Sequence, residues 1–180
     1  MKKITVLLAE DHTIVREGFR KMLELEKDIQ VVGEAQDGRQ AITLAKKLRP
    51  AVMLMDIAMP LLNGLEAMRQ VLKLLPEKVL MLSAHSDDAY VTNATESGAV
   101  GFLLKQTSAH DVCRAIREVH RGKTFFSSSI SKRLDRLHPQ VLLRMGVLSK
   151  KTAHLSSRER EVLQLILSIT HIFRIRFPSD

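Results

Sequence analysis

Five short apolar runs alternate along the chain with segments in which apolar residues recur at helical spacing. Unbroken apolar runs are typical of strands that are buried on both faces of a sheet. We predict such strands at residues 4–9, 29–35, 51–56, 78–84 and 100–105. The periodic segments predict helices at residues 13–26, 37–48, 64–75, 87–98 and 108–122. This alternation predicts an α/β fold, a doubly wound parallel sheet of five strands.

Charged and polar residues stand at the ends of four of these predicted strands. Glu10 and Asp11 follow the first strand, Asp56 ends the third, Ser83 ends the fourth and Lys105 ends the fifth. Taken singly, each is a common cap, turn former or solvated charge. In a doubly wound sheet, however, ligands bind beyond the carboxyl ends of the strands. We therefore expect these side chains to form one site.

The residue types at this edge indicate phosphoryl chemistry. Three carboxylates in one place repel one another unless a cation lies among them. Oxygen ligands suit Mg²⁺, which takes few carboxylates and keeps several waters. A carboxylate such as Asp56 can attack a phosphoryl group. The Ser83 hydroxyl, the Lys105 ammonium and the metal would then stabilise the negative charge of the transferring group.

The same residues occur within the segments LLAEDH, VMLMDIAMP with LNG, MLSAH and GFLLK. In this order the segments resemble the receiver domain of two-component response regulators, which has a flavodoxin/CheY-like fold. The resemblance implies that Asp56 is the phosphoacceptor and that a sensor histidine kinase is the partner. It implies Mg²⁺ as cofactor, with Glu10, Asp11 and Asp56 around the ion, Asp11 as a direct ligand and the backbone carbonyl of Ala58 as a further ligand.

The resemblance also implies a conformational switch. Ser83 and Phe102 match the hydroxyl and aromatic switch pair of this family. We expect the phosphoryl group to draw the Ser83 hydroxyl inward, so that Phe102 turns into the space that is vacated. This would change the surface of the fourth helix, fifth strand and fifth helix, with homodimer formation on phosphorylation as a readout.

A second resemblance concerns the rest of the chain. GFLLK together with the later segment LSSREREVLQLI is similar to the NarL/FixJ-like regulators, in which a linker joins the receiver to a LuxR-type helix-turn-helix domain. We predict a receiver at residues 1–122, a linker at 123–154 and the start of the DNA-binding domain at 155–180. After Ile166 the sequence departs from the family pattern and leaves too few residues for a recognition helix. We therefore expect a truncated output domain, from a frameshift or a premature stop, and assign no DNA-binding residues.

Composition and charge narrow the class of protein further. The net charge is +8, and after residue 123 basic residues outnumber acidic ones by 10 to 4. A basic segment can contact nucleic acid, but from charge alone we favour solvated linker charge. The single Cys excludes an intrachain disulfide. No segment resembles a signal peptide or a membrane span, so we expect a cytoplasmic protein with no membrane partner. The 7 His residues show no metal-ligand spacing.

Other classes of protein fit less well. A haloacid dehalogenase-type phosphatase needs an acid two residues after its nucleophile, where this chain has Ala58. A flavin-binding module needs a phosphate loop after the first strand, where Glu10, Asp11 and His12 would repel phosphate. We predict a phosphorylation-activated response regulator that controls transcription and is not an enzyme. The alternative is a receiver that acts only through protein–protein contacts, without specific DNA binding.

Overall fold

The computed structural model describes residues 3–76, 78–84, 88–127 and 130. The chain divides into two units, Met1–Leu134 and Asp135–Asp180, and the second unit lies outside the described residues. The predicted start of a DNA-binding domain, its truncation and most of the predicted linker therefore lie outside the described residues and stay predictions. None of the described helices is long and apolar enough to cross a membrane.

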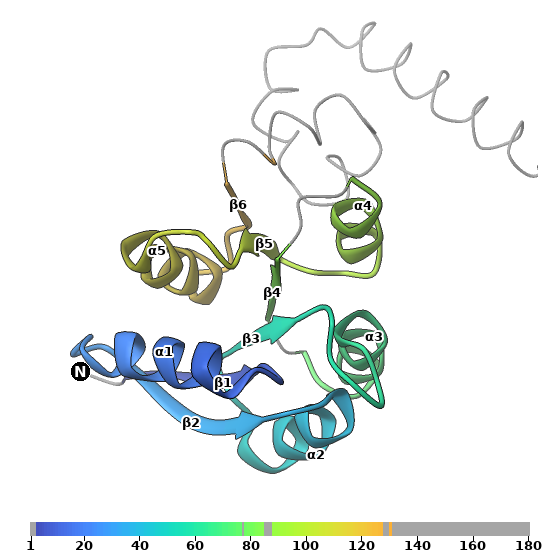
Figure 1. The fold of residues 1–180 in the computed structure, drawn as a ribbon, viewed down its shortest axis with the longest axis horizontal. Coiled ribbons are helices and arrows are strands. Elements are labelled where there is room, and N and C mark those ends of the chain that lie inside the picture. Colours follow the sequence, from blue (N-terminus) through green and yellow to red (C-terminus); the bar gives the residue numbers. More distant parts are fainter. Residues whose placement is uncertain (1–2, 77, 85–87, 128–129, 131–180) are drawn as a thin grey trace, which may run out of the picture. The chain divides into compact units, whose positions relative to one another are not determined.

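The first unit contains one parallel sheet with strand order β2-β1-β3-β4-β5-β6 (Figure 1). The strands are β1 (Ile4–Ala9), β2 (Ile29–Ala35), β3 (Val52–Asp56), β4 (Val79–Ser83), β5 (Gly101–Leu104) and β6 (Phe125–Phe126). The predicted doubly wound sheet is confirmed, but it has six strands rather than five. The sixth strand is missing from the prediction because two residues are too few to show a pattern.

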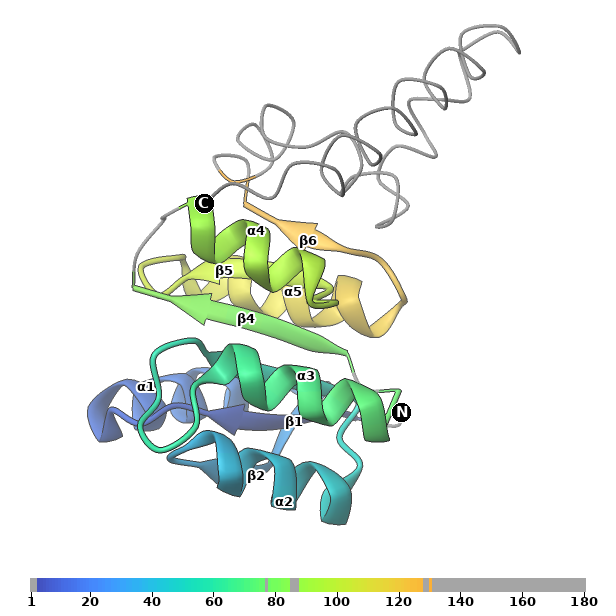
Figure 2. The ribbon, with the colours of Figure 1, turned by 90° about the vertical axis from the view of Figure 1, so that its right-hand side faces the viewer.

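The short strand β6 lies at the edge of the sheet beside β5 (Figure 2). Phe125 and Phe126 pair with Gly101 and Phe102, and the Phe125 amide donates to the Val100 carbonyl at 3.1 Å. A β-carbon at position 101 would lie only 2.5 Å from the Phe125 carbonyl oxygen, so glycine is required for this pairing. The first residues of the predicted linker therefore belong to the sheet.

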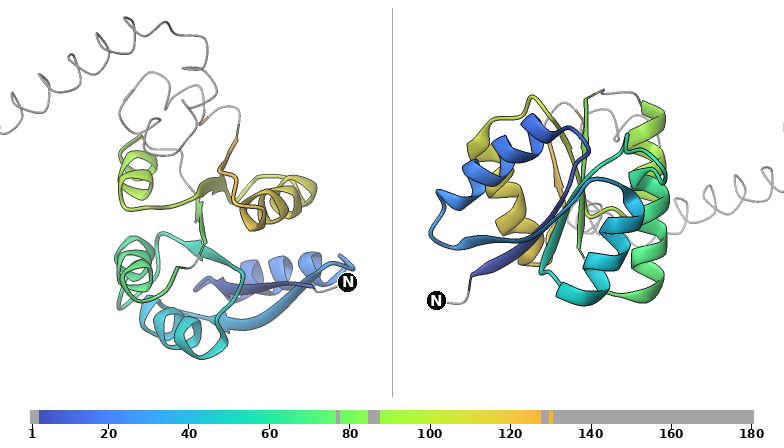
Figure 3. Two further views of the ribbon diagram at one scale, coloured as in Figure 1. Left: turned by 180° about the vertical axis from the view of Figure 1, so that it is seen from behind. Right: turned by 60° about the horizontal axis from the view of Figure 1, so that its bottom comes forward.

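Five helices cover the two faces of the sheet (Figure 3). Helices α1 (Thr13–Glu24) and α5 (Ala109–His120) lie on one face, and α2 (Gly38–Leu48), α3 (Gly64–Leu74) and α4 (Asp88–Glu96) lie on the other. Side chains cap three of the helix starts, since Asp37, Asn63 and Ser108 each accept a hydrogen bond from a backbone amide of the first turn. These caps fix where α2, α3 and α5 begin.

The buried face of α1 differs from the face that its apolar residues predict. Helical spacing places Ile14 and Leu25 with the core, yet both are largely exposed. Phe19 and Leu23, which the same spacing places with the core, are buried as predicted, together with the unexpected Arg16. Leu25 lies just beyond the last helical residue, and Ile14 stands in the first turn, so neither extends the buried stripe that runs through Phe19 and Leu23.

Candidate functional site

The predicted site residues meet at the carboxyl ends of the central strands. Glu10 and Asp11 directly follow β1, and Asp56 is the last residue of the neighbouring β3. Lys105 directly follows β5, and its backbone amide donates to the carbonyl of Ser83, the last residue of β4, at 2.8 Å. A parallel sheet aligns these ends, which is why residues far apart in the sequence share one edge.

A glycine in the following loop brings the backbone close to Asp56. The Gly64 amide donates to the Ile57 carbonyl at 2.9 Å, so the start of α3 folds back against the end of β3. A β-carbon on residue 64 would lie 1.9 Å from the Asp56 carbonyl oxygen. Any side chain at position 64 would therefore displace the backbone that carries Asp56.

Lys105 binds two buried carboxylates at once. Its Nζ lies 2.8 Å and 2.9 Å from the two oxygens of Glu10 and 2.9 Å from Oδ2 of Asp56. The Glu10 side chain is 0% exposed and that of Asp56 is 1% exposed. Burial lowers the pKa of Lys105, but the hydrogen bonds to Glu10 and Asp56 outweigh this effect, so the pKa is raised overall. Lys105 is therefore a fixed positive charge at neutral pH.

Negative charge exceeds positive charge in this cluster. Asp11, whose side chain is 25% exposed, adds a third carboxylate next to Glu10 and Asp56. Oδ1 of Asp11 and Oδ1 of Asp56 accept no hydrogen bond from any described residue. Oε2 of Glu10 is also outside hydrogen-bonding geometry, although the Lys105 ammonium lies 2.8 Å away. Buried oxygens without donors are rare, and a cation would satisfy them, so the donor set fits a divalent metal ion.

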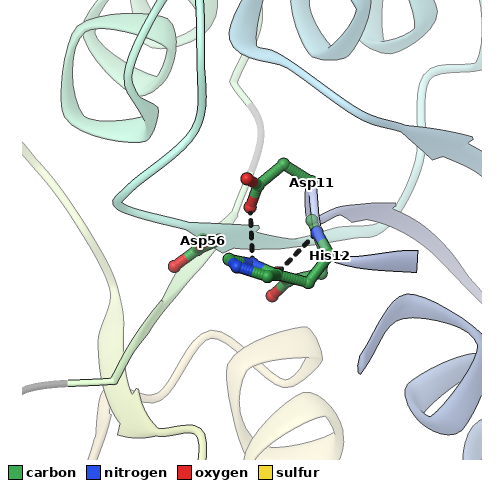
Figure 4. Close-up of side chains that lie close together, drawn as sticks. Asp11, His12 and Asp56 are labelled. Carbon is green, nitrogen blue, oxygen red and sulfur yellow. Dashed lines mark hydrogen bonds and ion pairs between the residues drawn. The ribbon is translucent and has the colours of Figure 1, made fainter. Parts of the chain in front are cut away.

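His12 lies in the same cluster, which the sequence did not predict. Its Nδ1 forms an ion pair with Oδ1 of Asp11 at 2.9 Å (Figure 4). The same nitrogen forms a hydrogen bond with Oε1 of Glu10 at 3.1 Å. Ligand atoms of Glu10, Asp11, His12 and Asp56 all lie within 4.8 Å of one another. The sequence shows no metal-ligand spacing among the histidines, and the structure groups His12 with three acids rather than with another histidine. The available signal was its position directly after the acidic pair.

Arg16 is a second residue that the sequence did not single out. Its side chain is buried, and Nη1 donates to the backbone carbonyls of Glu10 and Asp11 at 2.8 Å and 3.3 Å. Its Nε lies 3.3 Å from a carboxylate oxygen of Glu34. Arg16 thus holds the backbone of the acidic pair from one turn into α1. A charge on the otherwise apolar face of a helix was the signal for such a role.

The remaining predicted residues have different surroundings. Ser83 is buried at the end of β4, and Ala58 is exposed two residues after Asp56. Phe102 is fully buried. The expected inward turn of Phe102 would start from an exposed ring, but in this structure the ring is already buried. The roles of Ser83, Phe102 and the Ala58 carbonyl stay predictions.

Comparison with known proteins places this site in a family. The family model for the response regulator receiver domain matches residues 6–117. The chain is similar to the transcriptional regulatory protein DegU of Brevibacillus brevis, with 37% identity over 176 residues that cover 91% of this chain and 75% of DegU. It is also similar to the response regulator protein VraR of Staphylococcus aureus, with 39% identity over 168 residues and the same shares of 91% and 75%.

Solved structures agree with this assignment. The signal receiver domain of the response regulator NarL from Mycobacterium tuberculosis has a TM-score of 0.67 and 37% identity. That match covers 68% of this chain and 100% of the NarL domain. The similar structures thus include response regulators of the NarL and LuxR type. The chain belongs to the two-component response regulators and carries their receiver domain.

Proposed function

We propose that this chain accepts a phosphoryl group on Asp56 from a sensor histidine kinase. The observation that carries the proposal is that the two carboxylate oxygens of Asp56 have different surroundings. Oδ2 lies 2.9 Å from the Lys105 ammonium, and Oδ1 accepts no hydrogen bond within the described part of the chain. One oxygen is thereby held in place while the other stays available as the nucleophile.

In the proposed transfer, Oδ1 of Asp56 attacks the phosphorus atom of a phosphohistidine on the kinase. A P–O bond forms to Asp56 while the P–N bond breaks, and its electron pair returns to the imidazole nitrogen, which takes up a proton from water. Lys105 keeps its proton, since its pKa is raised. Its ammonium group, which already lies beside Asp56, would stabilise charge on the phosphoryl oxygens.

We propose Mg²⁺ as the cofactor, held by Asp11, Asp56 and the Ala58 carbonyl, with Glu10 nearby. The excess of carboxylates over Lys105 supports this assignment. Bound there, the ion would neutralise charge on the phosphoryl oxygens and on the carboxylates that must approach it. Both Glu10 oxygens lie next to the Lys105 ammonium, whereas Oδ1 of Asp11 accepts no hydrogen bond from a described residue and pairs with the His12 ring only through an ion pair. This contrast favours Asp11 over Glu10 as the direct ligand.

We also propose that phosphorylation acts through Ser83 and Phe102 on the surface of α4, β5 and α5, promotes homodimer formation and so controls transcription. The backbone hydrogen bond between Lys105 and Ser83 supports a link between the site and β5. If Ser83→Ala is phosphorylated normally and still changes its oligomeric state on phosphorylation, Ser83 is not the coupling residue. The alternative is that the chain acts through protein contacts alone. Measuring its binding to promoter and scrambled DNA duplexes tests this alternative.

Intact-mass measurement tests the phosphorylation itself. We expect the wild-type protein to gain one phosphoryl group when it is incubated with Mg²⁺ and acetyl phosphate. Asp56→Asn should stay unlabelled, because an amide is a poor nucleophile. Asp111→Asn is the matched control, since Asp111 is an acid in the first turn of α5 whose side chain contacts Ser108 and Arg114 rather than Lys105, and it should label like the wild type. Equal labelling of Asp56→Asn would overturn the proposal.

A further inference from the structure

His12 places a nitrogen atom at the mouth of the carboxylate cluster. Its side chain is 65% exposed, whereas that of Asp56 behind it is 1% exposed. The position of Nδ1 close to both Asp11 and Glu10 leaves the ring between solvent and the buried acids. An ion that entered from solvent would pass this nitrogen.

The site carries a second sign of a missing ligand. Oδ1 of Asp56 is buried and accepts no hydrogen bond from the residues that the structure describes, although it lies within the group. A buried carboxylate oxygen without a donor is costly. A cation bound between Asp11, His12 and Asp56 would compensate this charge, since ligand atoms of the three residues lie within 4.8 Å of one another.

The separations between the ligand atoms fit a small octahedral ion. Around such an ion, with bonds of about 2.1 Å, adjacent ligand atoms lie about 3.0 Å apart. Nδ1 of His12 is 2.9 Å from Oδ1 of Asp11, which agrees with this spacing, whereas its 3.1 Å contact with Oε1 of Glu10 is a hydrogen bond. Despite the distance of 2.9 Å, Oδ1 of Asp11 accepts no hydrogen bond from His12 or any other described residue. The contact is instead an ion pair, which a cation bound between the two atoms would replace.

The nature of the donor atoms determines which ions are favoured. Carboxylates suit Mg²⁺, whereas imidazole nitrogen suits first-row transition ions. We infer that Nδ1 of His12 is a direct metal ligand, and that the site therefore binds Mn²⁺ and Co²⁺ more tightly than Mg²⁺. The inference rests on the proposed function because it concerns the same metal site, but it does not depend on phosphorylation of Asp56.

Pulsed electron paramagnetic resonance on the Mn²⁺-loaded full chain tests the contact directly. We expect nitrogen hyperfine coupling from a bound imidazole in the wild type, its loss in His12→Gln, and its retention in His110→Gln. His110 is the matched control, because it is an exposed histidine on α5 whose Nδ1 lies 3.9 Å from Asp111. Co²⁺ absorption of the wild-type protein gives an independent reading of nitrogen ligation that needs no variant.

Binding titrations test the metal preference. The ratio of the Mg²⁺ to the Mn²⁺ dissociation constant should fall about tenfold or more in His12→Gln and stay unchanged in His110→Gln. Absence of nitrogen coupling in the wild type, or an unchanged ratio in His12→Gln, would overturn the inference.

Labelling of Asp56 with Mg²⁺ and acetyl phosphate, measured on the same preparations, separates this inference from the proposed function. Normal labelling without nitrogen coupling would overturn only the role of His12. Nitrogen coupling without labelling would support His12 as a ligand and overturn the proposed phosphotransfer.

Discussion

Two clusters of one base and two acids lie at opposite ends of the strands, and they differ in what their acids still lack. At the carboxyl ends, Lys105 pairs with Glu10 and Asp56, both almost fully buried. Near the start of β2, Arg117 pairs with Asp28 and Glu26, whose side chains are 43% and 38% exposed. In each, one base pairs with two acids, but the first cluster also contains Asp11 and His12, and only it leaves buried oxygens without hydrogen-bond donors among the described residues.

In the Arg117 cluster, the base and the acids satisfy one another's hydrogen bonds. Nε of Arg117 donates to Oδ2 of Asp28 at 2.8 Å and Nη2 donates to Oδ1 at 2.7 Å, a two-pronged pair that matches the guanidinium to the carboxylate. These hydrogen bonds raise the pKa of Arg117 and lower the pKa of Asp28. An ion pair alone therefore does not indicate a functional site. A functional site is indicated by buried negative charge that the neighbouring cations do not balance.

The largest expected difference between the clusters concerns stability. Lys105→Met would leave Glu10 and Asp56 buried without a cation, which should lower the free energy of unfolding by about 3 kcal/mol. Arg117→Met, in the water-exposed cluster, should lower it by about 1 kcal/mol. Urea unfolding of both variants measures the difference. Adding Asp56→Asn to Lys105→Met should recover part of the loss, and equal losses in the two single variants would remove the distinction drawn here.

Metal affinity sharpens the comparison within the first cluster. Asp11→Ala should weaken Mg²⁺ binding by about tenfold or more, or about 1.4 kcal/mol, because its free oxygen is placed for the ion. Glu10→Ala should have a smaller effect, because Lys105 already engages both of its oxygens. Calorimetric titration decides between them, with Asp28→Ala as the unaffected control. A larger loss for Glu10→Ala would mean that the ligand roles are reversed.

Removing one acid from each cluster should change stability in opposite directions. In the presence of EDTA, Asp11→Asn should raise the free energy of unfolding by about 0.5–1 kcal/mol, because it relieves repulsion with Glu10 and Asp56. Asp28→Asn should lower it by about 0.5–1 kcal/mol, because Arg117 loses a charged partner. Thermal unfolding of the two variants beside the wild type gives the signs. A shared sign would show that the two clusters are equivalent.

The smallest effect is the pH dependence of the Arg117 cluster. The hydrogen bond from Arg117 lowers the pKa of Asp28 below its ordinary value of 3.8 in the folded protein. A lowered folded-state pKa stabilises the protein above the unfolded-state pKa, and this contribution is lost as pH falls through the folded-state value. Unfolding from pH 6 down to about pH 3 should therefore show a steeper loss for the wild type than for Asp28→Asn. Parallel curves would contradict the assignment.

Much of the fold could be predicted from the sequence because the buried strands appear in it as unbroken apolar runs. The bounds of β1 and β2 were predicted to the residue, since their apolar runs end in charged or turn-forming residues. The strand-end acids and Lys105 were predicted to meet because parallel strands align their carboxyl ends. Their proximity is confirmed by the ion pairs of Lys105.

The residues that the sequence did not indicate depend on three-dimensional contacts. The position of Arg16 on the apolar face of α1 was a signal for a buried role, but only the fold turns its guanidinium toward the carbonyls of Glu10 and Asp11. His12 has no second histidine at a ligand spacing, so its grouping with Asp56 arises entirely from the pairing of β1 with β3. Likewise, Phe125 and Phe126 become a strand only because Gly101 leaves room beside β5.

That sixth strand has a consequence for self-association. A receiver that stopped at residue 122, where the family resemblance places the boundary, would lack β6 and would leave the outer edge of β5 open. An open strand edge presents a row of unpaired amides and carbonyls that can recruit another chain. Phe125 and Phe126 therefore cover the edge of β5 and protect it from pairing with another chain. A receiver that extends through these residues should stay monomeric at concentrations at which the shorter one associates through β5.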